Sequence, residues 1–126
     1  MIDARRGELF WAFYRSVPGG IQRTSEFRWG PPGKLAGEIE AQGEDTLCIG
    51  DGALEHRSLL ESAGAEVGTP SSAYPTAQAL VELALPRFLR EETQRPEDLH
   101  PTYIRQPDAR INWSKRGALL GGTPLQ

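Results

Sequence analysis

The sequence predicts an α/β domain with a mixed sheet, in which an antiparallel N-terminal hairpin is followed by helices packed on the sheet. Two observations support this class. Two strand-like runs open the chain, and segments with helical periodicity then alternate with short apolar runs. The length of 126 residues suits one domain of common size.

The densest apolar run lies at the N-terminal end, within residues 3–15. From Leu9 to Tyr14 every residue is aromatic, Ala or Leu, so both alternating faces of a strand would be apolar. A strand of this kind is normally covered on both sides, which predicts a central strand. Because a domain seldom begins with its most buried strand, we expect the chain to be part of something larger.

A second strand is predicted over residues 21–29, after turn residues at 16–20. Its alternation places Ile21, Phe27 and Trp29 on one side, and Arg23 and Ser25 interrupt that side. The two runs are therefore expected to pair as an antiparallel hairpin, and the second strand should be less buried than the first.

Shorter elements follow the hairpin. A helix is predicted over residues 34–42, with Leu35, Ala36 and Ile39 at helical spacing and Gly43 as its C-cap. A buried strand over 46–49, a helix over 54–63 ended by Gly64, and a short strand over 65–67 complete the series.

The last predicted helix opens at Pro75. Ala77, Leu80, Val81, Ala84 and Phe88 form one apolar stripe, and Pro86 inside it predicts a kink or a break. After a polar linker, residues 99–105 are interpreted as an edge segment or an extended crossing, and residues 114–126 as a polar Gly-Pro tail.

The net charge is -3, which argues against a protein that coats nucleic acid. The single cysteine, Cys48, lies in an apolar run, where a small core residue is the expected role. No apolar stretch approaches the ~18 residues of a membrane span, and no signal peptide is evident. We expect a soluble, cytoplasmic protein.

Catalytic patterns are weak. His56 and His100 lack the spacing of metal ligands, and no serine lies in a nucleophile motif. The turn Gly50-Asp51-Gly52 lies between a strand and a helix, where glycines let a backbone approach a phosphate. It matches neither complete phosphate-loop pattern, and a tight strand-to-helix turn explains it equally well.

Two charged groups have alternative interpretations. Asp3, Arg5, Arg6 and Glu8 open the first strand, where they would face a cleft or partner or simply pair with one another. Arg105, Arg110, Lys115 and Arg116 make the C-terminal segment locally basic, which suits either RNA contact or a solvated tail.

Four segments together resemble a known family. They are Asp3-Ala-Arg-Arg-Gly-Glu before an aromatic strand, Gly50-Asp51-Gly52-Ala53, Tyr74-Pro75-Thr76-Ala77 opening a helix, and Pro101-Thr102-Tyr103-Ile104-Arg105. In order and approximate spacing they are similar to the second half of the TsaB family of bacterial threonylcarbamoyladenosine biosynthesis proteins, a glycoprotease-like group. Ile111-Asn112-Trp113 fits the family's closing segment.

The resemblance implies an RNase H-like lobe of the actin-like ATPase fold over residues 1–113, with the family's first lobe absent. It implies a non-catalytic scaffold for threonylcarbamoyl transfer to adenosine 37 of tRNA. The implied partners are a TsaD-like catalytic subunit, a TsaE-like ATPase and the first lobe, with tRNA contacted indirectly and a homodimer as an option. The residues carried over as motif or interface candidates are Asp3, Arg5, Arg6, Gly7, Glu8, Tyr103 and Arg105.

The resemblance assigns no cofactor or metal to this chain, and it places any ATP–Mg²⁺ contact at an interface of the complex. One alternative stays open. A nucleotide-dependent domain related to actin-like kinases would use Asp3 and Asp51 at a phosphate–Mg²⁺ site, with Gly50 and Gly52 against the phosphate.

Overall fold

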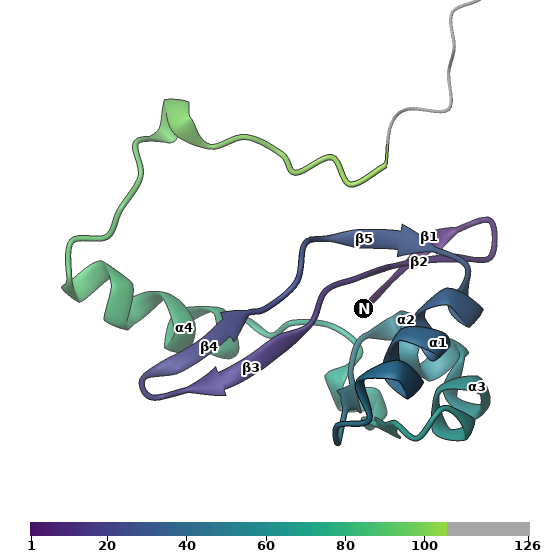
Figure 1. Ribbon diagram of the computed structural model, residues 1–126. Coiled ribbons are helices and arrows are strands. Elements are labelled where there is room, and N and C mark those ends of the chain that lie inside the picture. Colours follow the sequence, from purple (N-terminus) through teal and green to yellow (C-terminus); the bar gives the residue numbers. More distant parts are fainter. Residues whose placement is uncertain (106–126) are drawn as a thin grey trace, which may run out of the picture.

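The computed structural model describes residues 1–105. Figure 1 shows their path from the N-terminal strands to an extended segment over residues 90–105, which we call the C-terminal arm. The described part combines antiparallel and parallel strands with helices, which confirms the mixed α/β class. In chain order the elements are β1 (Ile2–Arg5), β2 (Glu8–Trp11), β3 (Tyr14–Val17), β4 (Gly20–Arg23), β5 (Arg28–Gly30), α1 (Pro32–Gln42), β6 (Leu47–Cys48), α2 (Asp51–Glu55), α3 (Arg57–Ser62), β7 (Glu66–Val67), the 3-10 turn η1 (Pro70–Ser72), α4 (Ala77–Leu89) and the 3-10 turn η2 (Pro96–Asp98).

The main sheet has the order β1-β2-β5, with both pairs antiparallel. The apolar run therefore does supply the central strand, β2, and it does pair with the second run. Leu9, Phe10 and Trp11 lie opposite Gly30, Trp29 and Arg28, respectively. The strand β1, which folds back on β2, was not predicted.

The prediction of one continuous strand from Leu9 to Tyr14 is wrong, because the ladder breaks at residues 12–13. There the Phe13 N–H donates to the Ser25 hydroxyl at 2.9 Å instead of to a facing carbonyl. The chain then continues as a separate two-stranded hairpin, β3–β4, which extends beyond the main sheet (Figure 1).

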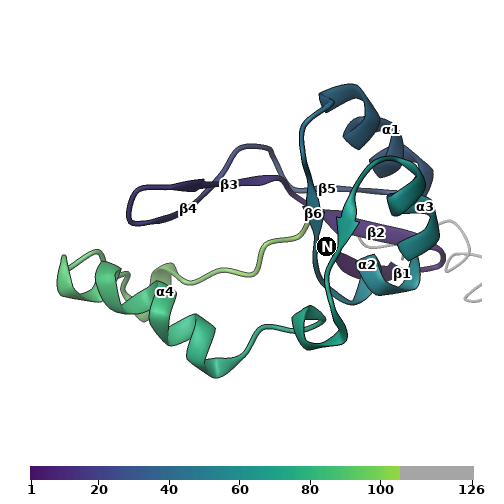
Figure 2. The same ribbon diagram turned by 90° about the horizontal axis from the view of Figure 1, so that it is seen from below.

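A short parallel pair, β6–β7, confirms the parallel strands predicted around residues 46–49 and 65–67. The strands form three separate sheets rather than the single mixed sheet that was expected. The Met1 amine donates to the Ile49 carbonyl at 2.6 Å, which joins the start of β1 to the end of β6. Figure 2 shows the N-terminus beside β6.

The prediction for α1 is confirmed closely. Its buried residues are Leu35, Ala36 and Ile39, and Gly43 ends it in the left-handed conformation, at φ 61°. The single helix predicted over 54–63 is instead two short helices, α2 and α3, divided at His56, whose ψ of 25° interrupts the helix.

One face of the main sheet carries the core. Helices α1, α2 and α3 lie together on that side of β1, β2 and β5 (Figures 1 and 2). Leu9, Leu35 and Leu60 are the largest fully buried side chains, and Trp11 is 4% exposed. Phe10, which points the other way, is only partly buried. Within residues 1–105, no helix lies on this second face, so the expectation that the central strand is covered on both sides is met only in part.

The last helix, α4, forms where its stripe predicted, and the Thr76 hydroxyl caps it by accepting from the Ala79 N–H at 3.2 Å. Of the two outcomes predicted at Pro86, a kink or a break, the break does not occur, because α4 continues through this residue as one helix. It has no buried residue, so the expectation that it packs on the sheet is wrong.

Several sequence predictions fall on positions outside the described residues. These are the family's closing segment at Ile111, Asn112 and Trp113, the basic residues Arg110, Lys115 and Arg116, and the tail over 114–126. Within residues 1–105, no helix is both long and apolar enough to cross a membrane.

Candidate interaction surface

The face of the main sheet that lies away from α1–α3 presents a lateral row of large apolar side chains. Ile2 pairs with Phe10 across β1 and β2, and Phe10 pairs with Trp29 across β2 and β5, so all three share this face. Ile2 is 61% and Trp29 41% exposed. We call Ile2, Phe10 and Trp29, with Phe27 at the edge, the open sheet face.

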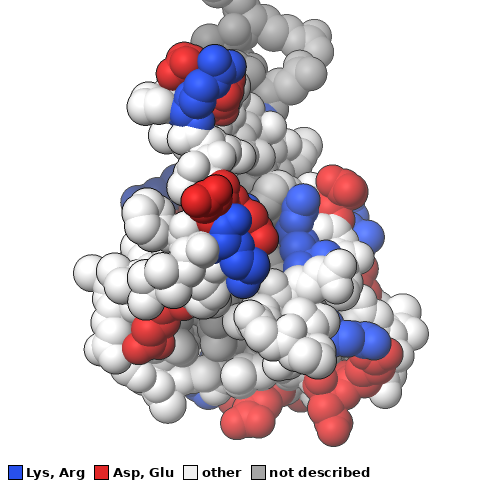
Figure 3. Space-filling model, turned by 90° about the vertical axis from the view of Figure 1, so that its left-hand side faces the viewer, with Lys and Arg blue, Asp and Glu red and all other residues white. Residues whose placement is uncertain are grey.

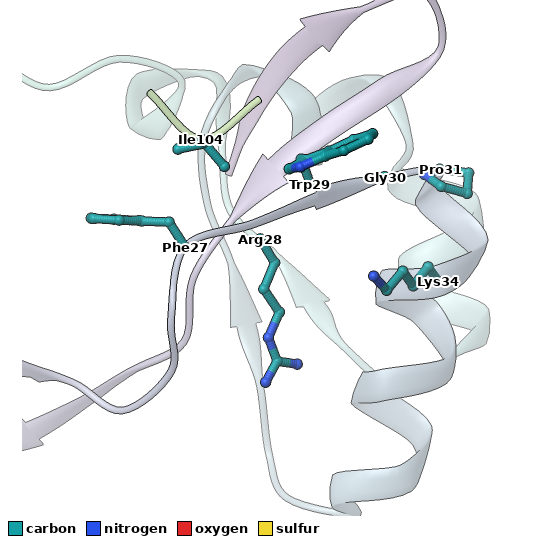
Figure 4. A pocket seen from close by; sticks show the side chains of 7 residues that line it. All are labelled: Phe27, Arg28, Trp29, Gly30, Pro31, Lys34 and Ile104. Carbon is teal, nitrogen blue, oxygen red and sulfur yellow. The ribbon is translucent and has the colours of Figure 1, made fainter. Parts of the chain in front are cut away.

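A hollow of about 440 Å³ lies at the β5 edge of this face. Phe27, Trp29 and Ile104 lie on one side of β5, whereas Arg28 points to the other (Figure 4). Ile104 belongs to the C-terminal arm, so the arm reaches the sheet here. The remaining lining residues are Gly30, Pro31 and Lys34.

The cationic side chains beside the hollow have partners. Arg28 pairs with Glu38 of α1 at 2.8 Å, and the same carboxylate accepts from the Trp11 indole N–H at 3.0 Å. The Lys34 ammonium lies 5.8 Å from the Trp11 ring centre. These contacts fasten α1 to β2 and β5, so the charges contribute to the fold rather than forming an open basic groove.

The sequence-predicted candidates Glu8 and Arg105 meet across the fold. Their side chains form an ion pair at 2.8 Å although they are 97 positions apart, and their exposed fractions are 27% and 22%. Such partial shielding reduces solvent screening relative to a surface pair. The pair holds the C-terminal arm against β2. Tyr103, by contrast, is 80% exposed.

The remaining candidates of the first motif form the turn between β1 and β2. Arg5, Arg6 and Gly7 all have positive φ, at 66°, 57° and 74°. Arg6 and Gly7 are the two residues of the loop, and positive φ at both is typical of the hairpin turn that favours Gly and Asn. This turn suits Gly7, whereas it strains the backbone at Arg6. Asp3 accepts from the Arg5 N–H at 2.9 Å and pairs with its guanidinium at 3.5 Å.

The glycine turn at residues 50–52 is in contact with the chain's own N-terminal strand. A β-carbon on Gly50 would collide with the Met1 backbone, and one on Gly52 would lie 2.6 Å from Leu9 Cδ2. The Gly50 N–H donates to the Ser72 carbonyl at 3.1 Å. The tight packing of strand and turn therefore accounts for both glycines.

Asp3 and Asp51 lie close together, but the contact is a hydrogen bond to the Asp51 carboxylate from the backbone N–H of Asp3. The Asp51 carboxylate accepts from the Asp3 N–H at 3.1 Å and from the Gly52 N–H at 2.8 Å. Asp51 is the first residue of α2, and the cap is Gly50, which makes no side-chain bond. Among residues 1–105, no three His, Cys, Asp or Glu side chains lie close enough together to hold a metal ion.

The surface of α4 is the largest feature that sequence reasoning did not identify as exposed. Leu80, Val81 and Phe88 of its stripe are 57–67% exposed, and the neighbouring Leu85 is 49% exposed. Figure 3, viewed from the side to which α4 and the β3–β4 hairpin extend, shows small groups of mixed charge separated by uncharged surface. The periodicity gave the position of the stripe, but it carries no information on what lies against it.

Together, the open sheet face and α4 are suited to contact with another macromolecule rather than to enclosing a small substrate, because both are apolar and accessible. Comparison with known protein families and with curated proteins finds no match to this chain.

Proposed function

We propose that this chain is the second lobe of a TsaB-like protein, with an RNase H-like fold of the actin-like ATPase type. In this proposal it acts as a non-catalytic scaffold in the formation of threonylcarbamoyladenosine at adenosine 37 of tRNA. It would work with a first lobe, a TsaD-like catalytic subunit and a TsaE-like ATPase, and would contact tRNA indirectly.

The observation that carries the proposal is the Glu8–Arg105 ion pair. Glu8 closes the first family-like segment and Arg105 closes the last, and the two side chains meet at 2.8 Å. The contact supports the proposal because it brings the first and the last family-like segments together.

Two further contacts support the same proposal. The bond from the Asp3 N–H to the Asp51 carboxylate joins the first segment to the glycine turn. Thr76 of the third segment caps α4, as a helix-opening motif requires. The apolar, accessible surfaces described above suit a scaffold, whose function is to hold other proteins.

The test is reconstitution of the modification. The full chain and a separately expressed first lobe are added to the catalytic subunit, the ATPase, ATP, threonylcarbamoyl-adenylate and unmodified tRNA, and modified adenosine is quantified. We expect modification to require this chain. Arg105→Glu should reduce it several-fold, and the double variant Glu8→Arg/Arg105→Glu should restore it. Arg95→Glu, the same charge change elsewhere on the arm, is the matched control.

Unchanged modification when the chain is omitted would reject the scaffold role.

A second measurement tests the alternative, in which the chain is a nucleotide-binding domain. A ligand that binds only the native state must stabilise it, so a rise in melting temperature with ATP and Mg²⁺ would favour that alternative. We expect no rise for the isolated chain.

A further inference from the structure

We propose that the end of the C-terminal arm is a releasable latch, which closes on the hollow beside β5 and opens as ionic strength rises. In the closed state Ile104 contacts the hollow and Arg105 pairs with Glu8. The proposal concerns a contact within the chain and does not rest on the proposed function.

The site that receives the arm combines apolar and acidic side chains on one face of the main sheet. Glu8 and Phe10 are two positions apart in β2, so both point to the open sheet face, whereas Leu9 between them is buried on the opposite face. Trp29 lies opposite Phe10 on β5 and shares their face. This face therefore has an aromatic surface with a carboxylate beside it.

The arm carries the complementary pair of side chains in consecutive positions. Ile104 lies with Phe27 and Trp29 on one side of β5 (Figure 4). Arg105 reaches Glu8 at 2.8 Å. An aliphatic side chain followed by an arginine thus matches an apolar hollow followed by a carboxylate, and the arm is the segment that occupies this site.

The chain makes a long exposed excursion before it reaches the site. All residues from 74 to 103 are exposed, and only Ile104 and Arg105 at the end of the described chain are partly shielded again. Figure 1 shows the excursion leaving through α4 and returning above β5. Fixing the two ends of such a segment costs conformational entropy, which the latch contacts must offset.

The latch contacts are of a kind that offsets this cost only narrowly. Glu8 and Arg105 retain exposed fractions of 27% and 22%, so water and salt ions still reach the pair. Ion pairs that solvent reaches contribute little and are weakened by salt. Because contact energy and loop entropy oppose each other with similar size, the closed and open states are both populated.

The state of the latch determines access to the hollow. Trp29 is 41% exposed while Ile104 lies against it, and release of the arm exposes it further. Release also frees the Glu8 carboxylate. The arm is therefore an internal occupant that a change in ionic strength can remove without unfolding the core.

The test is fluorine NMR of the full chain labelled with 5-fluorotryptophan. The chain has three tryptophans, and replacing each by Phe in turn assigns the signals. Trp29 reports on the arm, whereas Trp11, which is 4% exposed on the core side, reports on the fold. Raising NaCl from about 0.01 to 1 M shortens the Debye length from about 30 to 3 Å.

We expect the Trp29 signal to change with salt and the Trp11 signal to stay in place. The ratio of open to closed arm should rise about three- to five-fold, the factor that corresponds to loss of a partly exposed ion pair.

Four variants connect this change to the latch. Arg105→Gln should give the high-salt spectrum already at low salt, although Arg105 does not line the hollow. The exchanged pair Glu8→Arg/Arg105→Glu should restore the wild-type spectrum. Ile104→Ala should favour the open state at both salt concentrations. Arg95→Gln removes a charge elsewhere on the arm, where Arg95 pairs with Asp98, and should behave as the wild type.

The proposal is overturned if the Trp29 signal of the wild type does not respond to salt, since the arm would then be a fixed brace. It is also overturned if Arg105→Gln leaves the Trp29 signal at its low-salt position. A Trp11 signal that moves together with that of Trp29 would overturn it as well, because the whole domain would then be changing rather than the arm.

Discussion

Leu9 packs so closely against Gly52 that a β-carbon on the glycine would lie 2.6 Å from Leu9 Cδ2. This contact joins the fully buried centre of β2 to the first turn of α2. The turn at residues 50–52 is thus part of the core, and its small side chains are a packing requirement.

Gly52→Ala is expected to destabilise the protein by about 1–3 kcal/mol, because the added methyl group overpacks a site with no free space. Urea denaturation followed by tryptophan fluorescence measures the loss. Gly37→Ala is the control, since a β-carbon at Gly37 meets nothing within 4 Å and Ala favours the helix. Equal effects of the two changes would contradict the packing argument.

Arg6→Asn is expected to stabilise the chain by about 0.5–1 kcal/mol. Arg6 has φ 57° in a two-residue hairpin loop, a conformation that Asn adopts at lower cost. Gly7→Ala in the same loop should have the opposite sign, because Gly7 has φ 74°. Thermal unfolding of the two variants checks both. A destabilised Arg6→Asn variant would mean that the arginine side chain contributes more than the strain costs.

Glu38→Ala is expected to cost about 1–3 kcal/mol. The substitution removes the acceptor of the Trp11 indole N–H and the partner of Arg28, and Trp11 is nearly buried. Glu40→Ala on the exposed side of the same helix is the matched control and should change stability by less than about 0.5 kcal/mol. The midpoint of urea unfolding distinguishes the two, and similar midpoints would contradict the assigned role.

The pH dependence of stability above neutrality should include a contribution from Cys48. Burial raises the pKa of this thiol, although the nearby Met1 amine opposes the shift. Above the unfolded pKa of about 8.5, the unfolded chain loses the thiol proton while the native chain keeps it. Stability is therefore lost as pH rises through this window.

Urea unfolding of the wild type and of Cys48→Ala between pH 7 and 10 tests this expectation. The wild type should lose more stability with rising pH than the variant. Parallel curves would mean that the thiol has the same pKa in both states. Native Cys48 should also react slowly with a thiol reagent and react quickly in urea.

The sequence predicted most of the local structure, but it carried little information on which apolar surfaces are covered by other elements. The stripe Leu35, Ala36 and Ile39 predicted both α1 and its buried side, because a helix period and a left-handed glycine cap at Gly43 are local signals. The pairing of β2 with β5 was likewise predictable from two apolar runs with a turn between them.

The errors arose where distant groups decide the outcome. The Ser25 hydroxyl accepts a hydrogen bond from the Phe13 N–H at the point where the first strand is interrupted. Nothing within residues 9–14 indicates this contact. The stripe on α4 predicted a helix correctly, but an apolar pattern does not specify which molecule covers it. The Glu8–Arg105 pair could be named residue by residue from the family-like segments, whereas its contact needed the three-dimensional structure.

All buried residues of the described part lie between Ala4 and Val67. Amide hydrogen exchange should therefore divide the chain, with slow exchange in the core elements and fast exchange in α4 unless it is bound. Substitutions before residue 68 will act mainly on folding. Those in α4 lie outside the core and are expected to leave the melting temperature nearly unchanged.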